Sequence, residues 1–112
     1  MIYKKGDVVV LPFPFTDKSS AKRRPALVLS QNRFNTDTQQ SIFAMITSAK
    51  NSSWASDIAI TDTPSAGLNH DSIVRLKIFT LENQFIIRSI GTLCNKDLAA
   101  VNQELNKVIL VD

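Results

Sequence analysis

The chain has 112 residues, a length that fits a single domain spanning residues 1–112. Its 13 Lys and Arg against 10 Asp and Glu give a net charge of 13 − 10 = +3. With 44% hydrophobic and 21% charged residues, the composition is that of a globular protein and argues against disorder, collagen and coiled coil. We expect no membrane span, signal peptide, disulfide or cysteine-based zinc site, and therefore a cytoplasmic protein, because apolar runs are short and Cys94 is the only cysteine.

Alternating and β-branched apolar residues predict a chain that is mostly β. The first strand, residues 8–11, ends at Pro12, because proline lacks the backbone donor that a central strand needs. Further strands are expected at 25–30, 41–47, 57–61, 72–76 and 85–90. Their close spacing and short polar connections favour a curled antiparallel sheet or a small barrel.

The C-terminal segment has a different period and predicts a helix. Asn95 is a suitable N-cap, and Asp97 falls in the first turn, where its charge complements the helix dipole. One apolar face follows at spacings of three and four, formed by Leu98, Val101, Leu105 and Val108. The helix is expected to end near Lys107, and residues 109–111 could return as a last strand.

Charge is unevenly distributed, and two polar segments are candidate functional loops. Residues 1–56 carry eight basic and three acidic side chains (+5), whereas residues 57–112 carry five and seven (−2). A face formed by the first half could attract a polyanion, although ordinary surface scatter explains the difference equally well. Residues 16–24 are rich in cations, and residues 50–56 contain the only tryptophan, Trp54. Binding and catalysis concentrate in such loops, although a solvated loop is the more common case.

Arg24 and Thr47 are the strongest candidates for a shared site. Pro25 restricts Arg24 to an extended conformation at the start of a buried strand, which suits a bidentate phosphate contact, whereas Arg23 more simply solvates the strand entrance. Thr47 and Ser48 close the next strand, where their hydroxyls could bind phosphate or cap a turn. If the two strands pair antiparallel, Arg24 and Thr47 lie at the same end of the sheet.

Three other residues are weaker candidates. Arg75 and Lys77 alternate along a strand, so they form either a phosphate-binding pair or, more commonly, a solvated exterior. His70 is the lone imidazole and could act as an acid or base, although a single loop histidine is more often simply exposed.

Other chemistries find little support in the sequence. It has no GxGxxG, P-loop or HExxH motif, and three glycines are too few for a phosphate-cradling loop. No cluster of carboxylates or histidines suggests a metal site. We therefore expect neither a metal nor a cofactor.

Three motifs together resemble the MazF/PemK (Kid-like) toxins of type II toxin–antitoxin systems. They are Gly-Asp-Val-Val-Val at 6–10, Arg-Pro-Ala-Leu-Val-Leu-Ser at 24–30 and Ile-Thr-Ser at 46–48, and the similarity continues through 71–75 and the C-terminal helix. The resemblance implies an SH3-like β-barrel with a C-terminal α-helix, a homodimer, and a metal-independent endoribonuclease that cuts single-stranded RNA. It matches Arg24 and Thr47 to the catalytic arginine and threonine, and Arg75 to a basic residue used in some branches.

The sequence departs from the family pattern at two places. Residues 19–23 read Ser-Ser-Ala-Lys-Arg instead of the common Gly-Ser-Glu-Gln type, so substrate access can differ. Lys77 stands where some branches have a catalytic aspartate, which gives no support to an acid–base role at this position. Both departures are similar to a PemK-like branch with the Leu-Pro-Phe-Pro-Phe start found at 11–15.

The expected function is an RNA-cleaving toxin that acts on mRNA and has a cognate antitoxin as partner. Arg24 and Thr47, supported by Ser48, would stabilise charge on the phosphate while the 2′-hydroxyl attacks it. The general base that accepts the 2′-hydroxyl proton could be His70 or a transiently deprotonated arginine. RNA contacts are expected from Lys18, Lys22, Arg23 and Trp54. Trp54 and Phe34 could stack on unpaired bases, although either ring could equally belong to the core.

Two alternatives come from other functional classes. The first is a non-catalytic toxin that binds a protein target such as DNA gyrase, and the second is an inactive RNA-binding barrel, which would bind RNA in a salt-sensitive way without cutting it. The Arg24–Thr47 pair favours the nuclease, because a toxin that binds only protein has no use for that pair.

Overall fold

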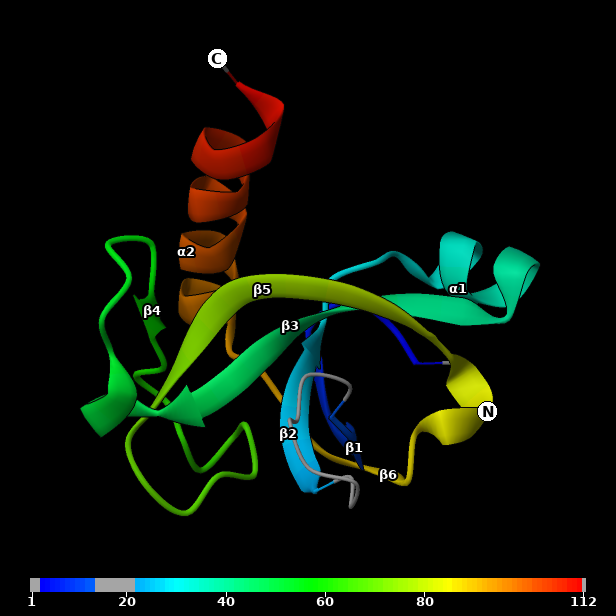
Figure 1. Cartoon of the computed structure of the whole chain (residues 1–112), viewed down its shortest axis with the longest axis horizontal. Coiled ribbons are helices and arrows are strands. Elements are labelled where there is room, and N and C mark those ends of the chain that lie inside the picture. Colours follow the sequence, from blue (N-terminus) through cyan, green and yellow to red (C-terminus); the bar gives the residue numbers. More distant parts are fainter. Residues whose placement is uncertain (1–2, 14–21, 112) are drawn as a thin grey trace.

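The computed structural model describes residues 3–13 and 22–111. Within them, six strands form one antiparallel sheet that curls into a half-barrel, with the order β4-β5-β3-β2-β1-β6 (Figure 1). The strands are β1 (Asp7–Pro12), β2 (Arg23–Val28), β3 (Gln40–Ser48), β4 (Ile58–Ala59), β5 (Ser72–Glu82) and β6 (Arg88–Thr92). The helices are α1 (Asn32–Thr38) and α2 (Asn95–Leu105). The expected class, mostly β with a C-terminal helix, is confirmed.

Both faces of the sheet are buried along much of β1 and β2, which explains the continuous apolar runs in these strands. Side chains alternate between the faces, so the neighbours Val8 and Val9 belong to two separate apolar clusters. One cluster includes Val101 of α2, together with Val8, Leu27, Ala44, Ile46 and Val74. The other includes the phenylalanine rings Phe13, Phe43 and Phe79, whose centroids lie 5.1 Å (Phe13–Phe79) and 5.4 Å (Phe43–Phe79) apart.

Asp97 ties α2 to the chain around β4. The helix begins at Asn95, with Cys94 as its N-cap, so the predicted N-cap at Asn95 is wrong by one residue. Asp97 is 2% exposed and accepts hydrogen bonds from Thr61 N (2.9 Å), Thr61 Oγ1 (2.7 Å) and Asp62 N (3.1 Å). Burial raises the pKa of this carboxyl, but these bonds and one from Cys94 outweigh it and hold the pKa below its usual value.

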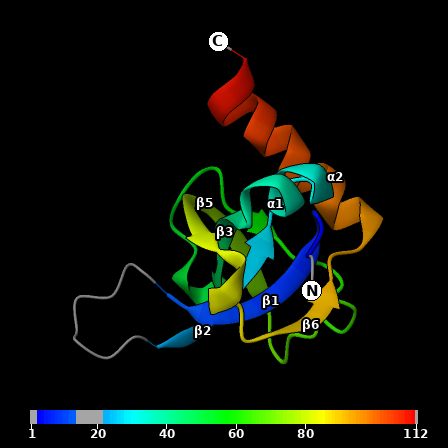
Figure 2. The same cartoon turned by 90° about the vertical axis from the view of Figure 1, so that its right-hand side faces the viewer.

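The C-terminal strand predicted at residues 109–111 is wrong. Residues Asn106–Leu110 continue α2 as a wider, π-helical turn, and both views show this end rising away from the sheet (Figures 1 and 2). Their side chains are exposed, from 53% for Val108 to 73% for Leu110. A strand needs a partner edge, and this segment lies beyond the sheet.

Three further predictions differ from the structure. β5 extends to Glu82, well beyond the predicted end at residue 76. The strand expected at 85–90 begins only at Arg88, because Asn83–Phe85 form a 3-10 turn that reverses the chain. The strand expected at 57–61 is reduced to Ile58–Ala59.

Helix α1 was not predicted, because it is held by a polar residue. Asn35, at the centre of α1, is fully buried and donates to Tyr3 O (2.7 Å) and Ser30 O (3.1 Å). Its backbone carbonyl accepts from Asn83 Nδ2 (2.9 Å). These bonds fix α1 to three separate segments without an apolar stripe on the helix.

Candidate functional site

The start of β2 and the end of β3 meet at one cleft, as the sequence predicts. The two strands pair antiparallel with Ala26 opposite Met45, so Arg24 and Thr47, each two residues further along, lie at the same end. The cleft beside them has a volume of about 400 Å³. It is lined by Val10, Arg24, Pro25, Ile46, Thr47, Ser48, Asn51, Gly67, Leu68, Asn69, His70, Ser72, Arg88 and Ile90.

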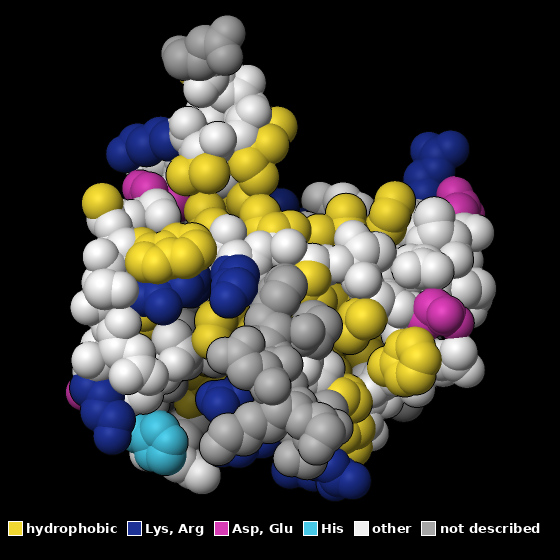
Figure 3. Space-filling model, viewed as in Figure 1, with side chains coloured by type: hydrophobic (Ala, Val, Ile, Leu, Met, Phe, Trp, Pro, Cys, Tyr) yellow, Lys and Arg dark blue, Asp and Glu magenta, His cyan; other side chains and the backbone are white. Residues whose placement is uncertain are grey.

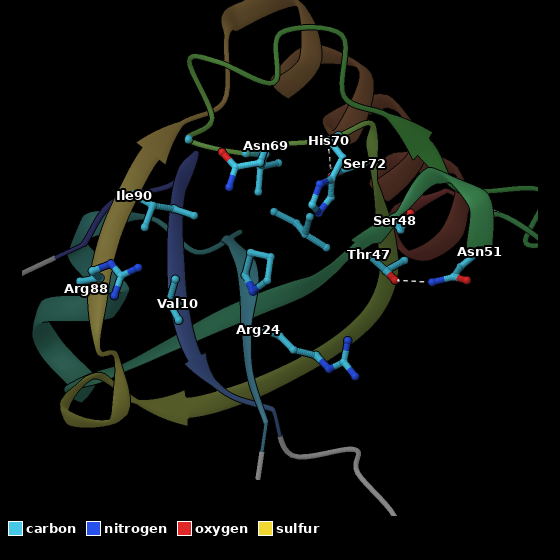
Figure 4. A pocket seen from close by; sticks show the side chains of 14 residues that line it. Val10, Arg24, Thr47, Ser48, Asn51, Asn69, His70, Ser72, Arg88 and Ile90 are labelled. Carbon is cyan, nitrogen blue, oxygen red and sulfur yellow. Dashed lines mark hydrogen bonds between the residues drawn. The ribbon is translucent and has the colours of Figure 1, made fainter.

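The cleft has an apolar floor and a polar rim. Figure 4 shows Arg24, Thr47 and Asn51 on the side of β3, Arg88 on the opposite side, and Asn69 and His70 on the third side. Pro25, Ile46, Leu68 and Ile90 supply the apolar surface between them. Such a combination suits a ligand with a flat apolar part and a charged part.

The two cleft arginines are available for an anionic ligand. Within residues 3–13 and 22–111, neither Arg24 nor Arg88 makes an ion pair or a side-chain hydrogen bond. Pro25, Val10 and Arg88 pair in one row across β2, β1 and β6. At a strand spacing of about 4.8 Å, the backbone of Arg88 lies roughly 10 Å from that of β2. Lys and Arg side chains also gather over the lower half of the face seen in Figure 3, with few acidic ones.

The segment that carries His70 is fixed by a close backbone approach and a hydrogen bond. Gly67 has φ of +75°, and a Cβ there would lie 2.0 Å from the carbonyl oxygen of Ile90, so only glycine fits. Ser72, at the start of β5, donates through its hydroxyl to His70 O (2.9 Å). The imidazole is exposed on the cleft side (Figure 4).

Thr47 is engaged by a neighbour that the sequence did not single out. Asn51 Nδ2 donates to Thr47 Oγ1 at 3.1 Å (Figure 4). Asn51 ends the 3-10 turn Ala49–Asn51 that follows β3 directly, and Ala49 N donates to Asp71 O (2.9 Å) at its start. This turn therefore brings the Asn51 amide back beside the end of its own strand.

Arg75 and Lys77 do not line the cleft, so the structure does not bring these predicted site residues to the others. Arg75 Nε and Nη2 donate to Asp57 Oδ1 (3.0 Å) and Oδ2 (2.8 Å), and Nη2 also donates to Asn51 O (3.1 Å). The guanidinium carbon lies 4.8 Å from the centroid of the Trp54 ring. Arg75 thus organises the loop between β3 and β4.

The ion pair between Arg75 and Asp57 is shielded from solvent and shifts the pKa of both residues. The Arg75 side chain is 13% exposed and that of Asp57 is 3% exposed. The hydrogen bond from Arg75, with further bonds from Trp54 N and Ser53 N, lowers the pKa of Asp57 to about 2 against the opposing effect of burial. The hydrogen bond to Asp57 raises the pKa of Arg75 in turn.

The expected RNA-contacting residues lie outside the cleft or outside the described chain. Lys22 and Arg23 are exposed next to Arg24, and Trp54, 43% exposed, stacks on Arg75. Lys18 falls outside the described residues. Phe34, on α1, is 39% exposed and does not line the cleft.

Several cleft residues were missed by the sequence analysis. Asn51, Asn69 and Ser72 are short polar residues in turn-rich segments, where asparagine and serine are common for purely local reasons. Nothing in the sequence indicated that Arg88 lies near Arg24. Only the pairing of β1 with both β2 and β6 places it across from Arg24.

In the described ranges 3–13 and 22–111, no three His, Cys, Asp or Glu side chains gather where they could hold a metal ion. No helix in the described part of the chain has both the length and the apolarity needed to cross a membrane.

Solved structures share this fold over nearly their whole length. An endoribonuclease in complex with its cognate antitoxin, from a mycobacterial species, has a TM-score of 0.78 and 15% identity, with 98% of this chain and 97% of that chain covered. A chain of the MazE–MazF complex (Form-II) from Deinococcus radiodurans has a TM-score of 0.77 and 18% identity, with 100% and 99% covered. The Mycobacterium tuberculosis toxin MazF-mt6 has a TM-score of 0.75 and 19% identity, with 95% and 98% covered.

Sequence comparison supplies the family. No curated protein matches the chain. A family model, described as the PemK-like, MazF-like toxin of type II toxin–antitoxin systems, matches residues 4–109. The resemblance noted in the sequence is therefore confirmed, and the chain belongs to the PemK-like, MazF-like toxin family of type II toxin–antitoxin systems.

Proposed function

We propose that this chain is an endoribonuclease toxin that cleaves single-stranded RNA in the cleft between Arg24 and Arg88. The observation that carries the proposal is the meeting of Arg24, which has no ion pair within the described residues, with the Thr47 hydroxyl at one end of two paired strands. The family membership and the related mycobacterial endoribonuclease support the same reaction.

The reaction uses the nucleophile that RNA itself carries and therefore needs no metal to supply one. The 2′-oxygen attacks the adjacent phosphorus, the bond from phosphorus to the 5′-oxygen breaks, and the products end in a 2′,3′-cyclic phosphate and a 5′-hydroxyl. Negative charge builds on the non-bridging oxygens as the 2′-oxygen adds. Arg24 stabilises that charge as a fixed cation, and Thr47 with Ser48 donates hydrogen bonds to the same oxygens.

One proton leaves the 2′-hydroxyl and one must reach the departing 5′-oxygen. His70 is our candidate for moving these protons, because its imidazole can both accept and donate and lines the same cleft. The hydrogen bond from Ser72 to its carbonyl oxygen holds the backbone in place.

Substrate binding follows from the charge and shape of the cleft. A base of the RNA packs on Pro25, Ile46 and Leu68, while Arg88 contacts a second phosphate across the floor. Lys22 and Arg23 extend the cationic surface beyond Arg24, where they attract the strand at longer range. Single-stranded RNA fits because its bases are free to leave the stack.

We further propose a cognate antitoxin, a homodimer and a cytoplasmic location, where the mRNA substrate is found. The related endoribonuclease was solved with its antitoxin, which supports such a partner. The exposed apolar residues Val108–Val111 at the end of α2 provide a surface that a second protein chain can cover.

The test is cleavage of a long single-stranded RNA in EDTA by the wild type and by Arg24→Ala, with Arg33→Ala as the control. Arg33 lies on α1 with its side chain 93% exposed, so its substitution removes the same charge away from the cleft. We expect discrete cuts with 5′-hydroxyl ends that Arg24→Ala loses and Arg33→Ala retains. Cuts that persist in Arg24→Ala would place the site elsewhere. A folded wild type that binds RNA without cutting it would instead support an inactive RNA-binding barrel.

A further inference from the structure

The Thr47 hydroxyl has one of its acceptor positions occupied from within the protein. A threonine hydroxyl offers one donor and two acceptor sites, and its proton turns to suit its neighbours. Asn51 Nδ2 donates to Thr47 Oγ1 at 3.1 Å. Because an N–H group points at this oxygen, the hydroxyl proton has to point elsewhere, and Thr47 lines the cleft (Figure 4).

We propose that Asn51 is a positioning residue that sets the Thr47 hydroxyl as a donor toward the scissile phosphate. The inference rests on the proposed endoribonuclease function and deepens it. Without the amide, the hydroxyl rotates freely and has to be oriented anew in each turnover. Preorganised donors are effective because they need no such reorganisation when charge develops.

Arg75 holds Asn51 in this position through the backbone. Arg75 Nη2 donates to Asn51 O (3.1 Å), and the same guanidinium is fixed by Asp57 and by the Trp54 ring. The carbonyl that Arg75 binds and the amide that reaches Thr47 belong to one residue. A shift of the Arg75 guanidinium is therefore passed to the Thr47 hydroxyl.

The assignment makes Arg75 a positioning residue instead of an RNA contact. Its Nε and Nη2 atoms are engaged within the protein, its side chain is 13% exposed, and it does not line the cleft. A phosphate that bound this guanidinium would have to compete with the Asp57 carboxylate. Arg75, which the family resemblance matched to a basic residue used in some branches, thus acts on the site through Asn51.

A double-mutant cycle between Asn51→Ala and Thr47→Val tests the relay. In the wild-type background, we expect Asn51→Ala to lower kcat about 10-fold, the equivalent of one hydrogen bond. In the Thr47→Val background, it should change kcat less than about twofold, because the hydroxyl that it positions is gone. KM, and the Kd for an RNA with a 2′-deoxy nucleotide at the cleavage site, should stay within about twofold of the wild type. The matched control is Asn102→Ala, which removes an exposed asparagine on α2.

A second variant separates positioning from phosphate binding by Arg75. Arg75→Lys keeps the charge but loses the two-pronged contact with Asp57. We expect Arg75→Lys to lower kcat in the wild-type background and to have almost no effect on kcat in the Thr47→Val background. The salt dependence of RNA binding should be unchanged. If Arg75 instead contacted a phosphate, its neutralisation in Arg75→Gln would reduce the slope of log K against log salt by about 0.7.

The outcomes distinguish this inference from the proposed function. If the wild type cleaves RNA and the effects of Asn51→Ala and Thr47→Val simply add, the positioning role is overturned while the nuclease stands. A change in KM alone, or a reduced salt slope for Arg75→Gln, also overturns it. If the wild type does not cleave RNA at all, both proposals fall together.

Discussion

Neutralising Asp57 should destabilise the protein by an amount that depends on pH. The Asp57 pKa lies at about 2, against a value of 3.8 for a free side chain. This lowered pKa corresponds to about 2 kcal/mol of folding free energy at pH 7. The Asp57 side chain is 3% exposed, so this value needs no large reduction for solvent screening. Asp57→Asn should lose about 2 kcal/mol at neutral pH.

The sign of the pH dependence follows from a pKa that is lower in the folded than in the unfolded state. The ionised carboxylate stabilises the fold above the unfolded pKa, and this contribution is lost as pH falls toward the folded pKa of about 2. The difference between wild type and Asp57→Asn should therefore stay near its full value down to about pH 5 and fall to about half near pH 3.

Urea unfolding of both proteins at pH 7, 5, 4 and 3 measures this difference. Asp37→Asn is the control, because Asp37 is 68% exposed and its contact with Arg33 is long, at 3.9 Å. Such a surface pair is worth about 0–1 kcal/mol. The reasoning is refuted if Asp57→Asn costs no more than Asp37→Asn, or if its cost is the same at pH 3 as at pH 7.

Three further predictions concern the cleft. Arg88→Gln should raise KM about 10-fold and reduce the slope of log K for RNA binding against log salt by about 0.7, whereas Arg33→Gln should change neither. If the two variants have equal effects, Arg88 does not contact the RNA. His70→Ala should lower kcat by about 100-fold or more with the cut positions unchanged, and wild-type kcat in this variant would exclude a proton-transfer role. Gly67→Ala should cost at least about 2 kcal/mol, measured by urea unfolding, because φ is +75° and the new Cβ meets the backbone of Ile90; an unchanged stability would mean that this turn relaxes freely.

The site pair could be predicted from the sequence because it depends on local rules and one pairing. Pro25 marks the start of a strand, and Thr47 ends the next apolar run. Two consecutive strands pair antiparallel in most small β-folds, and that pairing brings the two residues together although residues 29–39, which include α1, connect the strands. The strands β1, β2 and β3 were predictable for the same reason, since buried strands form uninterrupted apolar runs.

The contacts of Arg75 could not be predicted, because its partner is distant in the sequence. Asp57 lies 18 residues away and is brought close by the loop between β3 and β4. Alternation along β5 predicts that Arg75 and Lys77 share one face, and the period holds there, because Val74, Leu76 and Ile78 all pack in one apolar cluster. The alternation carries no information about the partner that Arg75 finds.

Polar anchoring explains the other missed elements. Helix α1 depends on the buried amide of Asn35, and hydrophobic periodicity carries no information about such a contact. The strand predicted at residues 109–111 followed from three β-branched and aliphatic residues in a row, yet the segment has no strand edge beside it and continues the helix. Whether a short apolar run forms a strand or a helix depends on the elements that pack around it, and these cannot be seen in the sequence alone.

The most direct test of the account is cleavage of one defined RNA beside the same RNA with a 2′-deoxy nucleotide at the cut position, both in EDTA. If the 2′-oxygen is the nucleophile and the Arg24–Thr47 cleft stabilises the resulting charge, the wild type cuts only the unmodified RNA and leaves a 2′,3′-cyclic phosphate. Arg24→Ala should then leave both RNAs intact, and Thr47→Val should cut only the unmodified RNA, at a reduced rate. Cleavage of the 2′-deoxy RNA at the same position would contradict this account of the cleft.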